Sequence, residues 1–198
     1  PRWGDWERMN AAPMVQRTAP DGVPYQDRTL WYPVYDSVSQ ATAITANLSF
    51  TYFAVGQSST KGANMTNLSQ SGQMPNNWGL RAVKMGISIP ANTAEVDIEH
   101  YQNSVSIALE LDGTKVWESP VEAAPSGFGI SGVAGATAIA LNLGPAAPAA
   151  TEVWSPPLLI PSGTNIVGTM THHAAITLAA AVVPRWYLIG VLDQAITN

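Results

Sequence analysis

The sequence predicts an all-β protein, an antiparallel β-sandwich, on three observations. Segments with alternating apolar and polar residues recur along the chain, the dipeptide Asp112-Gly113 marks a two-residue hairpin between two of them, and turn-rich intervals separate the others. A length of 198 residues is one that such sandwiches reach as a single unit. We therefore expect residues 37–198 to form one domain and residues 1–36 to form an extended N-terminal arm.

The arm is identified by its prolines and its aromatic residues. Five prolines interrupt every candidate helix in residues 1–36. The same segment is too aromatic for a flexible linker, so we expect it to lie on a surface, either of its own domain or of a neighbour. The interface candidates are Trp3, Trp6, Trp31, Tyr32 and Tyr35.

The clearest strands lie in the middle of the chain. Over residues 82–89, one face is expected to carry Val83, Met85, Ile87 and Ile89, and the other Ala82, Lys84 and Ser88. Over residues 105–111, the inward set is Val105, Ile107, Leu109 and Leu111, and the outward set is Ser106, Ala108 and Glu110. The chain then turns at Asp112-Gly113, where glycine accepts a positive φ.

Other segments complete the count of strands. We expect strands in "ITANLSFTYFAV" from Ile44, in "ATAIALNL" (136–143), and in the C-terminal runs "TNIVGTMT", "AAITLAAAVV" and "RWYLIGVL". Residues 56–79 and most of 123–157 are expected to be loops, because Ser, Asn, Gln and Gly dominate the first and Ala, Gly and Pro the second.

Two similar phrases are interpreted as corners between strands. They are "SIPANTAEVDI" from Ser88 and "LIPSGTNIVGT" from Leu159, in each of which a proline stops ladder pairing and a threonine begins a new alternating segment. About eight strands with two long loops are typical of a β-sandwich of the jelly-roll type.

Composition restricts the classes of function. The chain is 46% hydrophobic and 12% charged, against a usual charged share of about 25%, and it has seven tryptophans, which favours contact with copies of itself. A net charge of −5 argues against a protein that mainly neutralises phosphates, and the four arginines of residues 1–30 are balanced by four acidic residues. There is no cysteine, no apolar run of membrane-span length and no apolar signal core behind Arg2, so we expect a soluble protein made in the cytoplasm.

Three alternating carboxylates form the strongest candidate ligand set. If "EVDIEH" is a strand, Glu95, Asp97 and Glu99 share one face and could form a weak calcium site. The favoured interpretation is a solvated outer face with Val96 and Ile98 packed inward.

No catalytic residue and no cofactor are expected. His172 and His173 are adjacent, so in a strand they point to opposite faces, and we expect His100, His172 and His173 to be dispensable for metal binding. Neither a nucleophile elbow nor a phosphate-binding loop is found, which predicts a protein that is not an enzyme. Trp78, Trp117 and Trp154 lie near loops and could stack on a sugar, although tryptophan serves equally as a core or interface residue.

Together, the aromatic arm, the alternating body, corners such as "LIPSGTNIVGT" and the long polar loops resemble the single jelly-roll capsid proteins of icosahedral viruses and phages. The resemblance is to the overall pattern. It implies a structural virion protein that is made in the host cytoplasm and self-assembles into an icosahedral shell through its arm and loops. Its partners would be copies of itself and other virion proteins. Many such coats have a basic arm, and the balanced arm here predicts no strong direct binding to nucleic acid.

Two other functions fit the same pattern. A decoration, fibre or tail protein of a phage would share the composition. A carbohydrate-binding β-sandwich module would share the fold, and its ligand would be a glycan.

Overall fold

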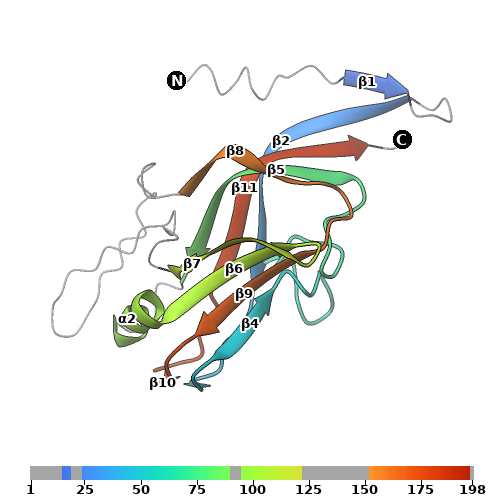
Figure 1. Ribbon diagram of the computed structural model, residues 1–198. Helices are drawn as coiled ribbons and strands as arrows, with labels where there is room; N and C mark the ends of the chain where they lie inside the picture. Colours follow the sequence, from blue (N-terminus) through green and yellow to red (C-terminus); the bar gives the residue numbers. More distant parts are fainter. Residues whose placement is uncertain (1–14, 19–23, 90–94, 122–151, 197–198) are drawn as a thin grey trace.

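The computed structural model describes residues 15–18, 24–89, 95–121 and 152–196 (Figure 1). The strands are β1 (Val15–Thr18), β2 (Pro24–Ser37), β3 (Ala43–Ile44), β4 (Leu48–Tyr52), β5 (Trp78–Ser88), β6 (Val105–Leu111), β7 (Thr114–Pro120), β8 (Glu152–Ile160), β9 (Ile166–His172), β10 (Ile176–Thr177) and β11 (Arg185–Ile196). Helix α2 (Glu95–Ser104) lies between β5 and β6.

The strands form two antiparallel sheets and one small ladder. The larger sheet has the order β1-β2-β11-β5-β8, the second has the order β4-β9-β6-β7, and β10 pairs with β3. All of these pairings are antiparallel. Figure 1 shows the two sheets as two layers. The all-β sandwich expected from the sequence is confirmed.

The strand order is that of one long hairpin rolled into two sheets. The first long strand, β2, pairs with the last, β11, and likewise β4 pairs with β9, β5 with β8 and β6 with β7. The pairs β5·β11 and β6·β9 then join the hairpin into sheets. This is the jelly-roll arrangement. The hairpin tip is the predicted turn, where Asp112 (φ 49) and Gly113 (φ 75) both adopt the positive φ of a type I′ turn.

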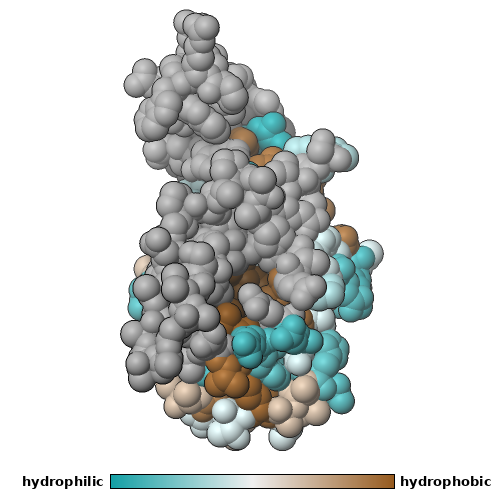
Figure 2. Space-filling view, turned by 90° about the vertical axis from the view of Figure 1, so that its left-hand side faces the viewer, coloured by the Kyte–Doolittle hydropathy of each residue, from teal (hydrophilic) through white to brown (hydrophobic). Residues whose placement is uncertain are grey.

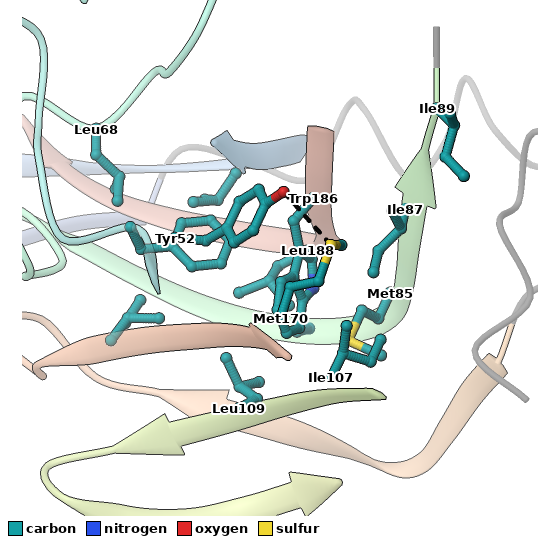
Figure 3. Close-up of a cluster of buried hydrophobic side chains, with 14 of the residues drawn as sticks. Tyr52, Leu68, Met85, Ile87, Ile89, Ile107, Leu109, Met170, Trp186 and Leu188 are labelled. Atoms are coloured by element: carbon teal, nitrogen blue, oxygen red, sulfur yellow. Dashed lines mark hydrogen bonds between the residues drawn. The ribbon is translucent and has the colours of Figure 1, made fainter. Parts of the chain in front are cut away.

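The core lies between the sheets and is centred on Trp186 of β11 (Figure 3). Trp186 is fully buried and makes an edge-to-face contact with Tyr52, with ring centroids 5.6 Å apart. Gly168 of β9 makes room for the indole, because a Cβ at this position would lie 2.9 Å from the Trp186 ring. In β6 the predicted inward residues are confirmed: Val105, Ile107 and Leu109 are buried and Leu111 is partly buried.

The predicted faces of β5 are wrong at Val83 because the strand contains a bulge. The buried residues are Leu80 and Ala82 before the bulge, and Met85 and Ile87 after it. In the pairing with β11, Gly190 lies opposite Ala82 and the next residue, Ile189, lies opposite Lys84. The extra residue is Val83, so Ala82 faces the core, opposite to the expectation. Gly190 allows the close approach at this point, since a Cβ there would lie 2.0 Å from the Arg81 carbonyl oxygen.

Residues 24–36, which the sequence assigns to the extended arm, are extended but form part of the five-stranded sheet. These residues belong to β2, which pairs with β11 from Gln26 to Ser37. Pro24 begins the strand. The Pro33 carbonyl accepts from the Asn67 side chain, so the backbone of Pro33 faces away from β11 and its missing N–H breaks no ladder bond. Trp3 and Trp6 lie outside the described residues.

Of the two predicted corners, one is confirmed. After Ile160 and Pro161 the chain turns at Gly163 (φ 74) and enters β9. The other is wrong, because Glu95–Ser104 is a helix rather than a strand. Its buried residues Asp97, Ile98 and Tyr101 follow the helical period, while Val96, expected to point inward, is 62% exposed.

The loop that joins β4 to β5 packs on the sandwich. Leu68 and Met74 within it are fully buried, and its backbone forms isolated bridges at Thr66 and Gln73. In "AAITLAAAVV" the structure has the two-residue strand β10 and a bridge at Val182 in place of one continuous strand. The expected strand at residues 136–143 lies outside the described residues.

Candidate functional site

A buried polar cluster lies at the end of the sandwich that carries α2. Its centre is Gln40, which is fully buried and follows β2 in the chain. The Gln40 side-chain oxygen accepts a hydrogen bond from the Tyr101 hydroxyl of α2 and contacts His172 Nε2 of β9 at 3.1 Å. The side-chain nitrogen of Gln40, Nε2, lies 3.2 Å from Met170 Sδ and 3.5 Å from the Tyr52 hydroxyl. The Tyr52–Met170 hydrogen bond of this cluster is drawn in Figure 3.

Two histidines extend the cluster toward the surface. His100 Nε2 lies 3.0 Å from His172 Nδ1, and the two rings stack with centroids 5.2 Å apart. His172 is fully buried. Burial, together with the nearby His100 and His173, lowers the pKa of His172 to about 4. Burial also lowers the pKa of His100, and the Asp97 carboxylate opposes that shift.

The tyrosines of the cluster are held in the neutral form. Burial and the neighbouring Tyr101 raise the pKa of Tyr52 well above its ordinary value, and burial and Asp97 raise the pKa of Tyr101. Both phenols are therefore hydrogen-bond donors at neutral pH. The cluster as a whole is a set of neutral groups that connects residue 40, β4, β9 and α2.

Glu95, Asp97 and Glu99 do not share one face, because they lie in a helix rather than in the predicted strand. In a helix, Glu95 and Glu99 lie on one side and Asp97 on the other. Asp97 is 1% exposed, and its Oδ2 accepts a hydrogen bond from the Ala179 N–H at 3.1 Å. Glu99 is exposed, and the side chain of Glu95 lies outside the described part of the structure. The strand on which the calcium site depended is thus replaced by a helix that separates its members.

The opposite orientation expected for His172 and His173 is confirmed. His172 faces the core, whereas His173 is exposed and its Nε2 lies 2.7 Å from the Ser106 hydroxyl. Within the described ranges no group of three or more histidine, aspartate and glutamate side chains is arranged to hold a metal ion. The contact between His100 and His172 was not predicted, because 72 residues separate them and no pattern links them.

Two of the predicted interface residues contact their own chain. Tyr32 makes an edge-to-face contact with Trp78, with centroids 5.7 Å apart. The Tyr35 hydroxyl donates to the Ala63 carbonyl, and the guanidinium of Arg185 lies 5.4 Å from the centre of its ring. Trp31 lies in β2 opposite Val191, but its ring is outside the described part.

The β4–β5 loop covers the open edge of β2. The Asn67 side chain makes the hydrogen bonds that a neighbouring strand would make. It donates to the Pro33 carbonyl at 2.6 Å and accepts from the Tyr35 N–H at 2.9 Å. Asp36, fully buried, accepts from the Phe53 N–H at 2.6 Å and pairs with Lys61 Nζ at 2.6 Å. Such cover protects an edge that could otherwise pair with another chain.

The tryptophans considered for sugar stacking do not share one sheet. Trp78 begins β5 of the five-stranded sheet, and Trp117 belongs to β7 of the four-stranded sheet. Both are partly buried and pack against the core. The ring of Trp154, in β8, lies outside the described part.

The surface view adds one apolar area near α2. Figure 2 shows hydrophobic residues gathered beside hydrophilic ones on the face that looks left in Figure 1. Val96 of α2 and Leu159 of β8 are the most exposed large hydrophobic residues in the described ranges, at 62% and 63%.

No helix in these ranges is long and apolar enough to cross a membrane.

Comparison with protein-family models, with curated proteins and with solved structures finds no match to this chain.

Proposed function

We propose that the chain is a structural virion protein, a capsid subunit that self-assembles into an icosahedral shell. The observation that carries this proposal is the strand order of the rolled hairpin, β2-β11-β5-β8 over β4-β9-β6-β7. Viral capsid proteins are one of the main classes built on this arrangement, beside lectin domains and cupins. Its partners would be copies of itself and other virion proteins.

The sheet edge formed by β1 supports the same proposal. β1 is the edge strand of the five-stranded sheet, and the outer ends of β1, β2 and β11 reach beyond the four-stranded sheet in Figure 1. Residues 1–14, which include Trp3 and Trp6, precede this edge strand in the sequence, and in this proposal they contact a neighbouring subunit. Low charge supports this further, because surface buried between subunits needs few charged groups.

The proposal is tested by the size of the purified protein. Sedimentation velocity and negative-stain electron microscopy of the full chain are expected to show closed particles of uniform size. Rings, fibres or small defined oligomers would favour the decoration, fibre or tail protein instead. A monomer at all concentrations that binds a glycan array would contradict assembly and favour the carbohydrate-binding module.

A further inference from the structure

Helix α2 is held to the end of the sandwich by polar contacts as well as by packing. Ile98 and Tyr101 are its buried apolar residues. Around them, Asp97 accepts from the Ala179 N–H, the Tyr101 hydroxyl donates to Gln40, and His100 contacts His172 at 3.0 Å. The helix therefore depends on hydrogen bonds whose donors and acceptors must be in one protonation state.

The direction of the hydrogen bonds follows from Gln40. Its side-chain oxygen can only accept, so the proton on His172 must be on Nε2, which faces that oxygen at 3.1 Å. His172 Nδ1 is then without a proton and accepts from the Nε2–H of His100. The chain of donors runs from His100 through His172 to Gln40.

This arrangement accommodates one added proton but not two. The first can enter at Nδ1 of His100, which leaves the bond between the rings intact. A second must enter at Nδ1 of His172, where it faces an N–H of His100 at 3.0 Å. Two cationic rings would also lie stacked, 5.2 Å between centroids.

Other groups around His172 do not relieve this conflict. From α2 it faces His100 and Tyr101, with Asp97 one turn away, from β4 it faces Phe50, and beyond the end of β9 lies His173. Tyr52 of β4 belongs to the same cluster through Gln40. The Asp97 Oδ2 accepts from the Ala179 N–H, and its Oδ1 is buried without a hydrogen-bond partner in the described residues. Its charge favours the protonated form of His100 and thus the first proton, but Asp97 is not among the groups that shift the pKa of His172.

We propose that α2 is an acid-sensitive latch, which leaves the end of the sandwich when the His100–His172 pair takes up its second proton, while the two sheets stay packed. The inference concerns this chain alone and does not depend on what it assembles with. The pKa of His172 is lowered to about 4 in the closed state and returns to its ordinary value of about 6.5 in the open state. Closure is therefore fully favoured above about pH 6.5 and loses this preference as the pH falls toward 4.

Hydrogen–deuterium exchange measured by mass spectrometry tests the latch at pH 7.5 and pH 5.0, with labelling times scaled for intrinsic exchange. The two pKa values imply that the opening of α2 increases about 10- to 30-fold between these conditions. Peptides from residues 95–104 should lose protection by that factor. Peptides from β5 and β11 should keep theirs.

Three variants assign the effect to the histidine pair. His172→Gln keeps a donor toward Gln40 and cannot take up the proton, so the pH dependence of α2 should disappear. His100→Gln should reduce it, because the amide can turn its oxygen toward a protonated His172. His173→Gln, at the exposed neighbour, is the matched control. Because His173 makes the smallest of the three contributions to the lowered pKa of His172, this variant should keep most of the parent's pH dependence.

Each contrary result overturns the latch. Protection of α2 that is equal at both pH values, or that is lost together with the protection of β5 and β11, excludes local opening. A pH dependence that persists unchanged in His172→Gln assigns it to another group. If His172→Gln does not fold, a pH dependence that is unchanged in His100→Gln likewise overturns the latch.

Discussion

Single residues in the core set the spacing of the two sheets. Gly168 of β9 faces Trp186 of β11, and its missing side chain is the space that the indole occupies. The indole is also packed by Tyr52 and by Phe53, whose ring centroids lie 5.6 and 6.0 Å away. Because the ring is enclosed on several sides, it cannot move aside at low cost.

We therefore expect Gly168→Ala to lower the free energy of unfolding by about 1 to 3 kcal/mol, the usual cost of overpacking. The control is Gly79→Ala, since no atom lies within 4 Å of a Cβ placed at Gly79. Chemical denaturation of both variants and the parent measures the difference. Equal stability of the two variants would show that Trp186 can shift, and that the spacing of the sheets is not set at this position.

At this scale the sequence predicts what depends on local chemistry. The turn at Asp112 and Gly113 is predictable because the turn itself requires their positive φ. The orientation of Val83 is not, because a bulge depends on the neighbouring strand, where Gly190 permits the backbone approach. The sequence correctly predicts that His172 and His173 point to opposite faces. It does not predict the partners of His172, because Gln40 and His100 lie 132 and 72 residues away in the chain.

Among the elements, the β4–β5 loop and α2 depart most from the expectation. The loop is long and polar as predicted, yet it is fixed on β2 by Asn67, by Asp36 and by Arg185, which bonds to Ser37 and to the Asn64 carbonyl. The six residues from Glu95 to His100 alternate and therefore predict a strand, whereas the helical spacing of Ile98 and Tyr101, three residues apart, becomes visible only when the following residue is included. The structure of such segments is determined by their contacts with distant parts of the chain and not by their local sequence pattern.

The ion pair between Asp36 and Lys61 should contribute most to the docking of the loop. The two side chains are 0% and 12% exposed, so Lys61→Met leaves a buried carboxylate without its partner and should cost about 2 to 4 kcal/mol of stability. Lys115→Met, which breaks the pair with Glu118 at 49% and 55% exposure, should cost less than about 1 kcal/mol. Urea denaturation compares the two. A Lys61→Met variant as stable as Lys115→Met would mean that Asn67 and the buried Leu68 hold the loop without the ion pair.

For the whole molecule, alternation and turn chemistry predict the sandwich, and the rolled strand order follows from pairings that the structure supplies. The predicted arm extends too far along the chain, to residue 36, because prolines such as Pro24 and Pro33 disfavour a strand when only the sequence is considered. In the structure both prolines lie in β2, at positions where no N–H is needed for strand pairing. A deletion of residues 1–30 would thus remove half of β2 and test folding rather than assembly. The segment that precedes all described strands is residues 1–14.

We expect deletion of residues 1–14 to leave a folded sandwich that assembles poorly. Circular dichroism and thermal melting should match those of the parent, because every described pairing of β1 and β2 is kept. Burial of an aromatic ring on a neighbour stabilises a contact by roughly 1.5 to 3 kcal/mol before ordering costs, and about 1.4 kcal/mol corresponds to a factor of ten in affinity. The truncated protein should therefore require at least about tenfold higher concentration to sediment as particles.

The full-length double variant Trp3→Ala, Trp6→Ala separates the rings from the length of the segment. If the rings carry the contact, this variant should assemble as poorly as the truncated protein while melting at the temperature of the parent. Assembly at the parent's concentration in both variants would remove the N-terminal segment from the interface and leave the loops and sheet edges to form it. A melting temperature that falls in both would instead place Trp3 and Trp6 against their own subunit, where they would contribute to its folding.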